Sequence, residues 1–301
     1  MKGPGRIIVS SAGNNSHSPN YVYKPFGKES AGTFLETWSG AIYFMSTGRQ
    51  NYDTRLVFYG DKNDTLTISS DWLCTQPDSL HYDTLEIKDR QYIVAEGAYP
   101  DCYDNEKLVV EIYIQGSDHM GGSVCPISVE TVGEATEVET YKVAGSFVKK
   151  PNNPQLCDAV VAKNINSPSC CEAVICVGST SYSTGYVNIY GEEKTYDYGQ
   201  NGVRSSFSSV GPTFDGRIKP EVMAPGANIV SSTNSYYFEA NPDDPQFSDF
   251  VDTYEYDGRT YYWKADTGTS MSSPAVGGAI ALWLEAKPDL TREDILDVFA
   301  H

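Results

Sequence analysis

The chain has 301 residues, of which 40% are hydrophobic, and this length and composition suit a globular protein with more than one core. Its formal net charge of −18 argues against nucleic acid and anionic membranes as partners, because both repel a negative protein surface. No apolar run approaches the ~20 residues needed to cross a bilayer, so we expect no membrane span.

The first predicted element is a buried β-strand. Residues Ile7 to Val9 are continuously apolar, as strands of a parallel sheet are when both faces are covered. The strand is followed by the small residues Ser10 to Gly13 and then by the polar residue Asn14. The side chain of Asn14 is therefore predicted at the carboxyl end of a parallel strand.

A different pattern occupies residues 16–150. Short runs with period-two alternation recur without any helix signal, at residues 40–45, 54–59, 65–68, 84–87, 91–94 and 108–114. Such runs at close spacing are typical of a β-sandwich. Trp38 and Trp72 could form a glycan-binding face, but core and edge positions of the sandwich are the favoured interpretation.

Mixed elements follow the predicted sandwich. Residues 173–179 are predicted as a buried strand, 180–203 as a surface loop or hairpin, and 228–231 as a short strand. Residues 235–252 are polar and acidic and are predicted as a loop. Residues 254–263 are predicted as a hairpin, because an Asp-Gly turn separates two aromatic runs.

The hexad Gly268–Ser273, closed by Pro274, carries the strongest chemical signal. Pro is tolerated in a first helical turn, and the all-apolar run from Ala275 to Leu284 predicts a buried helix after it. Ser270 is then exposed at the amino end, where free N–H groups and the helix dipole favour negative charge. That arrangement suits a nucleophilic serine. An ordinary helix cap rich in Ser and Thr has the same sequence pattern.

The last predicted helix has a clear start. Thr291 is its N-cap, Asp294 completes a capping box, and Leu290 and Ile295 form a hydrophobic staple. Its buried side is predicted as Ile295, Leu296, Val298 and Phe299.

Three segments together resemble the subtilisin-like serine proteases: the strand ending in Asn14, the stretch 205–226 with its Phe-Ser-Ser-Val-Gly-Pro and Met-Ala-Pro-Gly motifs, and the hexad. The resemblance implies that Ser270 is the nucleophile and that Asn14 is the side-chain donor of the oxyanion hole. It also implies that Ser11, Ala12 and Gly13 bind substrate, as a strand edge and as a wall of the specificity pocket. The implied substrate is a peptide or protein.

The resemblance also implies the fold and its organisation. We expect an α/β fold: a partial subtilisin-like parallel sheet with flanking helices, interrupted by an all-β insert. Residues 1–15 and 151–301 are predicted to form the C-terminal part of the protease domain. Residues 16–150 resemble the jelly-roll-type insert of some bacterial members of this family.

The catalytic Asp and His of this family precede the oxyanion Asn along the chain, so both are expected upstream of Met1. None of the histidines stands in the family's His-Gly-Thr context; they are His17, His81, His119 and His301. A serine hydroxyl without a positioned imidazole is a poor nucleophile. This chain is therefore predicted to be inactive alone, and a missing N-terminal segment is expected to supply Asp and His.

No cofactor or metal site is predicted. Asp243, Asp244 and Asp249 could hold the calcium ion that this family often binds, but a solvated acidic loop is favoured. The seven cysteines include no Cys-x-x-Cys pair, so a zinc site is not expected, and Cys176 is predicted to be a core thiol. The resemblance suggests an extracellular or cell-envelope location, which the residues themselves leave undetermined.

Three functional hypotheses remain open at this point. The chain is part of a serine endopeptidase, or a non-catalytic subtilisin-like binding protein, or a fragment completed in trans by a separate piece carrying Asp and His. The presence of both Ser270 and Asn14 favours the first hypothesis.

Overall fold

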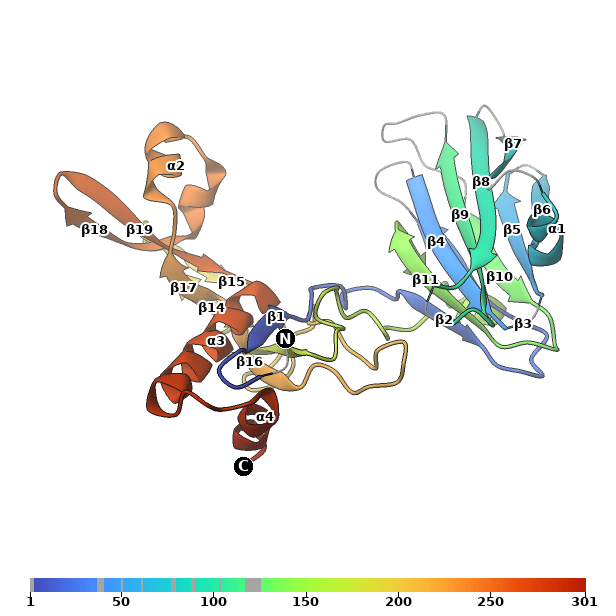
Figure 1. The fold of residues 1–301 in the computed structure, drawn as a ribbon. Coiled ribbons are helices and arrows are strands. Elements are labelled where there is room, and N and C mark those ends of the chain that lie inside the picture. The colour runs from blue at the N-terminus through green and yellow to red at the C-terminus, as the bar shows by residue number, and fades with distance from the viewer. Residues whose placement is uncertain are drawn as a thin grey trace. The chain divides into compact units, whose positions relative to one another are not determined.

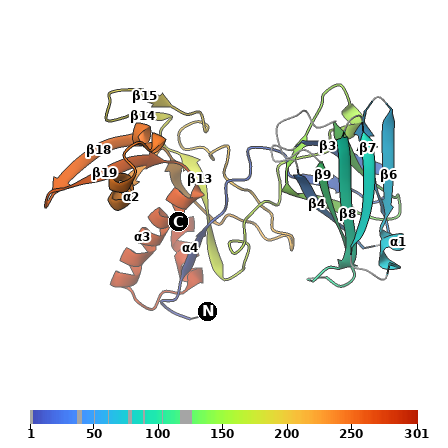
Figure 2. The same ribbon diagram turned by 90° about the horizontal axis from the view of Figure 1, so that it is seen from above.

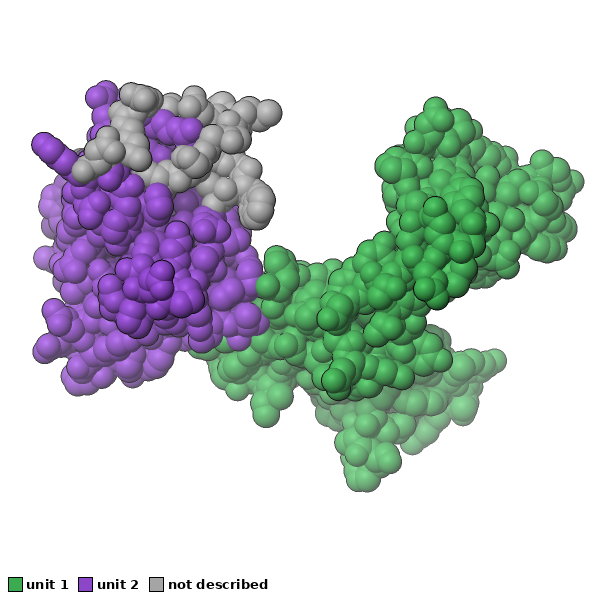
Figure 3. Space-filling model, turned by 180° about the vertical axis from the view of Figure 1, so that it is seen from behind, with its two compact units in different colours: residues 1–17, 162–301 green, residues 18–161 purple. Residues whose placement is uncertain are grey.

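A computed structural model of the chain describes residues 3–36, 41–49, 51–60, 62–76, 80–87, 90–102, 104–116 and 126–301. These residues form two compact units, which Figure 3 distinguishes by colour. Unit 1 comprises residues 1–17 and 162–301, and unit 2 comprises residues 18–161. The sequence predicts the boundaries of the insert between residues 15 and 16 and between residues 150 and 151, whereas the two units meet between residues 17 and 18 and between residues 161 and 162.

A three-stranded parallel sheet forms the centre of unit 1. Its order is β1 (Ile8–Ser11), β13 (Val174–Ser181) and β16 (Val222–Ala227), and both strand pairs are parallel. Unit 2 lies between β1 and β13 in the sequence, so two strands that pair in the sheet are far apart along the chain. This sheet, with its helices, confirms the predicted α/β class.

Two helices pack against the sheet of unit 1. Helix α3 (Thr269–Ala286) contacts all three strands, and α4 (Arg292–Ala300) follows it (Figure 2). The shared core consists of residues from β13, β16 and both helices, with Leu290 from the connection between the helices: Ile175, Val177, Val222, Ala224, Val276, Ile280, Leu290 and Ile295. Burial of this apolar surface is the main force that holds the helices on the sheet.

The apolar run of α3 is not buried on all sides, contrary to the sequence prediction. Val276 and Ile280 point into the core, whereas Leu282 is 67% exposed. The reason is geometric, because a helix lying on one three-stranded sheet has neighbours on one side only. The outer face of α3 is therefore an exposed apolar surface in the described part of the chain.

Helix α4 begins as predicted. The Thr291 hydroxyl accepts a hydrogen bond from the Asp294 N–H at 3.2 Å, and the Asp294 carboxylate accepts one from the Thr291 N–H at 2.8 Å. Ile295 is fully buried, but Val298 is 47% exposed. The prediction of Val298 on the buried side was wrong, because the helix presents Ile295, Leu296 and Phe299 to the core instead.

The remaining elements of unit 1 are small. Strands β14 (Gly185–Val187) and β15 (Glu193–Thr195) form a hairpin, and β17 (Ile229–Ser232), β19 (Arg259–Asp266) and β18 (Phe250–Tyr256) form an antiparallel sheet. The turn between β18 and β19 has positive φ at both Asp257 and Gly258, as the Asp-Gly signal predicts.

The prediction of a loop over 235–252 was wrong. The segment contains helix α2 (Ser235–Ala240), the 3₁₀ helix η2 (Pro245–Asp249) and the start of β18. Its residues Phe238, Phe247 and Phe250 form a small aromatic core with Tyr262 of β19, in which all four rings contact one another. This packing orders a stretch whose polar composition suggested a loop.

Unit 2 is a β-sandwich, in agreement with the alternating pattern of its sequence. One sheet has the order β12-β3-β10-β5-β6 and the other β2-β11-β4-β9-β8-β7, and all the strand pairs are antiparallel. The core draws on both sheets, with Phe44, Leu56, Phe58 and Ile112 fully buried. Trp72 is partly exposed at 42%, and Trp38 lies outside the described residues.

The elements of unit 2 have the following bounds: β2 (Tyr21–Lys24), β3 (Ser30–Glu36), β4 (Ala41–Gly48), β5 (Asp53–Tyr59), β6 (Asn63–Ser69), α1 (Ser70–Cys74), β7 (His81–Ile87), β8 (Arg90–Pro100), β9 (Leu108–Gly116), β10 (Ile127–Val132), β11 (Val138–Ala144), β12 (Ser146–Val148) and the 3₁₀ helix η1 (Pro154–Leu156).

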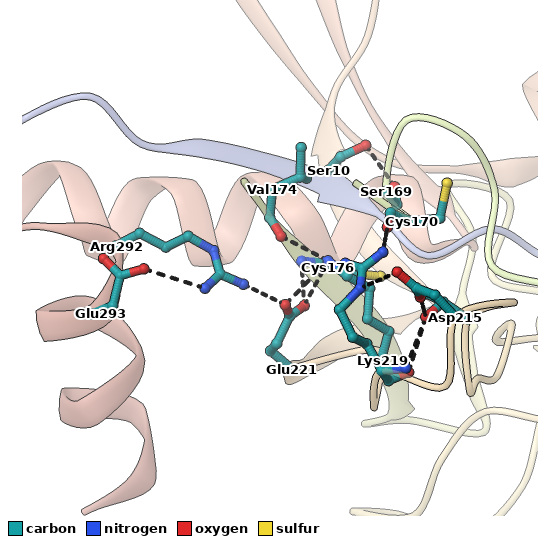
Figure 4. A network of polar contacts seen from close by, with 12 residues as sticks. Ser10, Ser169, Cys170, Val174, Cys176, Asp215, Lys219, Glu221, Arg292 and Glu293 are labelled. Carbon is teal, nitrogen blue, oxygen red and sulfur yellow. Dashed lines mark hydrogen bonds and ion pairs between the residues drawn. The ribbon is translucent and has the colours of Figure 1, made fainter. Parts of the chain in front are cut away.

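A polar network joins the sheet of unit 1 to α4 (Figure 4). The ammonium of Lys219, whose side chain is 1% exposed, lies 3.1 Å from the Glu221 carboxylate and donates to the Val174 carbonyl at 2.8 Å. The same carboxylate accepts the Cys176 N–H at 2.9 Å and pairs with the Arg292 guanidinium. Glu221 thus connects β13, the start of β16 and α4 through one side chain.

Replacement of Glu221 should destabilise unit 1. The variant Glu221→Ala leaves the Lys219 charge buried without its partner, and breaking a buried pair in this way costs about 3–5 kcal/mol. The change is measured as the free energy of unfolding in urea, followed by circular dichroism. Glu293→Ala is the matched control, because Glu293 also pairs with Arg292 but its side chain is 79% exposed. Equal losses in both variants would contradict this role for Glu221.

Candidate active site

The chain turns sharply after β1, and this turn presents Asn14. The Ala12 N–H donates to the Val177 carbonyl at 2.8 Å, so the pairing with β13 continues to the end of the strand. Gly13 has φ of +108°, and a Cβ there would lie 2.6 Å from the Asn166 side chain. Glycine is required at this position, and the turn places Asn14 at the carboxyl edge of the sheet.

A second close approach brings the start of α3 to the same edge. The Gly268 N–H donates to the Gly226 carbonyl near the end of β16 at 2.8 Å. A Cβ on Gly226 would lie 2.1 Å from the Ser272 hydroxyl and 2.5 Å from the Ser179 hydroxyl. Only glycine lets the helix start approach β16 this closely.

Thr269 connects the two predicted catalytic residues. The Oδ1 atom of Asn14 accepts hydrogen bonds from the Thr269 N–H at 2.9 Å and from the Thr269 hydroxyl at 3.0 Å. The same hydroxyl accepts the Gly13 N–H at 3.1 Å. These bonds hold the carboxamide oxygen of Asn14, so its NH₂ group is the end left for another acceptor. The contact places Asn14 beside the residue that precedes Ser270.

Ser270 is the second residue of α3 and is exposed. Among the described residues, neither its N–H nor its hydroxyl has a hydrogen-bond partner. The N-cap residue, Gly268, supplies no side-chain bond either. The first turn of α3 therefore keeps a free donor beside the serine hydroxyl, where a developing negative charge is stabilised.

Pro274 is the sixth residue of α3, in the second turn rather than the first turn predicted from the sequence. It has no N–H to donate to the carbonyl of Ser270, four residues earlier. The backbone around Ser270 is therefore held by the Gly268–Gly226 and Asn14–Thr269 contacts more than by the helix itself.

The predicted substrate-binding residues have little free backbone. Ala12 and Gly13 use both their N–H and C=O groups: Ala12 with Val177 and Asn166, and Gly13 with Thr269 and Ser209. The Ser11 carbonyl accepts the Ser169 hydroxyl at 2.6 Å. These bonds occupy the backbone groups of Ala12 and Gly13 and the carbonyl of Ser11.

Sequence reasoning missed two residues of this site. Thr269 orients Asn14, and its place in the hexad was a usable signal. Asn166 accepts a hydrogen bond from the Asn15 side chain at 2.7 Å and donates its N–H to the Ala12 carbonyl at 2.8 Å. No sequence motif marks Asn166, because the contact depends on how the segment before β13 folds over the turn.

The histidines are not arranged as a catalytic base. The His17 ring lies 3.2 Å from the Asn14 carbonyl and the His301 ring 3.0 Å from the Asp297 carbonyl, and both rings are exposed. His81 belongs to unit 2, and His119 lies outside the described residues. No described histidine is hydrogen-bonded to Ser270.

The other candidate groups have structural roles. Asp244 caps η2 and accepts the Tyr237 hydroxyl at 2.9 Å, and Asp249 accepts the Tyr186 hydroxyl at 2.8 Å. These bonds involve two of the three carboxylates that were considered for calcium, Asp244 and Asp249. Burial raises the pKa of the Cys176 thiol to about 12, which makes it unreactive at neutral pH. The described cysteines are all free, and Cys125 lies outside the described residues.

Comparison with known proteins places residues 152–301 in the Subtilase family. Serine protease AprX of Bacillus subtilis is 39% identical over 99 residues, which cover 32% of this chain and 20% of AprX. Minor extracellular protease Vpr of the same organism is 37% identical over 92 residues, covering 30% of this chain and 9% of Vpr. The chain thus spans a fifth or less of these two relatives.

A solved structure resembles the fold of nearly the whole chain. The Clostridium perfringens CspB protease matches with a TM-score of 0.61 and 17% identity, over 96% of this chain and 52% of that protein. The likeness therefore includes both units. No helix in the described part of the chain has the length and apolar character needed to cross a bilayer.

The hydroxyl of Thr269 should matter for stability as well as for orientation. The variant Thr269→Val keeps the shape of the side chain but leaves the Gly13 N–H without an acceptor, at a cost of about 1–3 kcal/mol. Thr269→Ser keeps the hydroxyl and should cost much less. Urea unfolding compares the two variants, and equal stability of Val and Ser would show that the bond contributes nothing.

Proposed function

Because this chain belongs to the subtilase family of serine proteases, we propose that Ser270 is the nucleophile of a serine endopeptidase. Asn14 and the Ser270 N–H form the oxyanion hole. The observation that carries the proposal is the double hydrogen bond from Thr269 to the Asn14 oxygen, at 2.9 and 3.0 Å. It leaves the amide NH₂ of Asn14 and the N–H of Ser270 as two donors at the same edge.

The proposed reaction is acyl transfer. The Ser270 hydroxyl attacks the carbonyl carbon of a peptide bond and loses its proton to a base, and the carbonyl oxygen becomes negatively charged. The two donors stabilise that oxygen, and each is already in place before the reaction begins. The amine leaves with a proton, and water then hydrolyses the acyl-enzyme.

No described residue of this chain is placed as the base that takes the proton of Ser270. We propose that a segment N-terminal to these residues supplies Asp and His. Two surfaces support this: β1 is an edge strand of the parallel sheet, and the outer face of α3 exposes Leu282. An unpaired parallel edge and a bare apolar helix face are each unfavourable in water, and a further layer of the domain would cover both.

The proposed substrate is a peptide or protein, with broad specificity. The turn at Ser11, Ala12 and Gly13 has small side chains, so a pocket lined by them accepts a large side chain. Asn15, next to the proposed oxyanion donor, is uncharged, and so nothing at this turn selects for basic substrates. The short side chains, not strand pairing, are the proposed contribution of this turn.

The alternative function is a non-catalytic one. The absence of a hydrogen bond from any described histidine to Ser270 favours a subtilisin-like binding protein, or a fragment completed in trans by a piece carrying Asp and His. The three possibilities differ in what the upstream coding sequence contains. An Asp and a His-Gly-Thr motif in one reading frame favour the endopeptidase, and substituted residues favour the binding protein.

The chain of 301 residues should not hydrolyse casein and should not be labelled by a fluorophosphonate probe, because no base activates Ser270. Loss of the His or the Ser lowers turnover about a million-fold in subtilisin itself. The protein extended upstream to include Asp and His should regain both activities. Labelling of the short chain would contradict the proposal that the base is missing.

In the extended protein, Ser270→Ala should abolish hydrolysis. Asn14→Leu should lower kcat by about a hundred-fold or more, the loss known for the equivalent donor in subtilisin. The matched control is Ser273→Ala, one turn further along α3. Steady-state assays with a peptide substrate give kcat and KM, and an unchanged kcat in Asn14→Leu would remove Asn14 from the mechanism.

A further inference from the structure

Three side chains on β7 and β8 of unit 2 lie close together, and none of them belongs to the site described above. His81 and Asp83 are two residues apart on β7, so they point to the same face. Glu96 on β8 is directly opposite His81 in the strand register. Tyr92 and Val94 share the face of Glu96 and are buried in the core, so the three side chains lie on the inner face of the sheet, where Glu96 is buried and the His81 and Asp83 side chains are 37% and 38% exposed.

The polar atoms of these side chains are close enough to share a ligand. One nitrogen of His81 and one oxygen each of Asp83 and Glu96 all lie within 4.8 Å of one another. The His81 Nε2 atom is 4.0 Å from the Asp83 carboxylate. Bonds from Zn²⁺ to imidazole and carboxylate are about 2.0–2.2 Å long, so the side chains would need to close by about 1 Å.

Glu96 is the observation that points to a ligand. It is only 2% exposed, and its Oε2 atom is buried without any hydrogen-bond partner. No described Lys or Arg forms an ion pair with it. A carboxyl oxygen that is buried without a hydrogen-bond partner is unfavourable, and a cation shared with His81 and Asp83 would supply the missing partner.

Trp72 of α1 contacts the imidazole ring of His81. Its ring packs edge-on against the His81 ring, with 4.7 Å between centroids and 87° between planes. This contact restricts the orientation of the imidazole relative to the two carboxylates. The His81 side chain is thus positioned by a neighbour outside the cluster.

We propose that His81, Asp83 and Glu96 bind one divalent first-row transition cation. One imidazole nitrogen and two carboxylate oxygens are a donor set that suits Zn²⁺, Mn²⁺ or Fe²⁺. Water completes the coordination. The ion neutralises the two carboxylates and joins β7, the edge strand of its sheet, to β8 (Figure 1).

The proposal departs from the sequence analysis, which predicted no metal. The spacing of His81, Asp83 and Glu96 matches no common metal motif. Their proximity depends on the antiparallel register of β7 and β8, which the sequence does not reveal.

The test is a titration of the full chain with Co²⁺, after alkylation of the exposed Cys74, Cys102 and Cys171 thiols. We expect one Co²⁺ to bind per chain, with visible d–d absorption and without a thiolate charge-transfer band. The midpoint of thermal unfolding should rise with Co²⁺. Glu96→Gln and His81→Gln should each weaken binding at least ten-fold and abolish that rise.

Two variants serve as matched controls. Glu86→Gln changes an exposed acid on β7, and His17→Ala removes an exposed imidazole in unit 1. Both should bind Co²⁺ as the unaltered chain does. Circular dichroism checks that every variant is folded, and Asp83→Asn replaces Glu96→Gln if the latter does not fold.

Two results would overturn the proposal. One is the absence of saturable binding of Co²⁺, Zn²⁺ or Mn²⁺ to the full chain. The other is binding that persists in His81→Gln and Asp83→Asn, or that the two controls weaken equally. In either case the cluster is a protonated Glu96 beside Asp83, and not a metal site. Neither result bears on Ser270 or Asn14.

Discussion

The contact between Asn14 and Thr269 is the constraint on which unit 1 depends. It joins the end of β1 to the first residue of α3, two points separated by nearly the whole chain. One carboxamide oxygen accepts both the N–H and the hydroxyl of Thr269, and the hydroxyl accepts the N–H of Gly13. Each group in this small cycle has a partner, so the turn and the helix start are fixed relative to each other.

Glycine makes that constraint possible. Gly13 lets the strand turn, and Gly226 lets the helix start approach β16, at positions where any Cβ would meet Asn166 or Ser272. At the other end of the sheet, Glu221 has the corresponding role, since it joins two strands and α4 around the buried charge of Lys219. The short sheet is therefore held at both ends by polar contacts, and in the middle by apolar packing.

Unit 2 is stabilised in a different way from unit 1. Its strands are antiparallel, and its core is made by alternation within short runs, so it needs no contact from the rest of the chain to define it. Insertion of such a unit between β1 and β13 is tolerated because closing a longer loop adds little entropy cost. The same alternation brings His81, Asp83 and Glu96 onto the inner face, where an isolated carboxylate is unfavourable.

The amino-acid sequence determined the features with a local cause: the alternating strands of unit 2, the capping box of Thr291 and Asp294, and the Asp257–Gly258 turn. Each depends on residues a few positions apart. Only the tertiary structure decided which end of the Asn14 amide is free, that Leu282 and Val298 face solvent, and that residues 235–240 are helical around Phe238. Those outcomes depend on neighbours distant in sequence, and a local pattern contains no information about which surface will cover it.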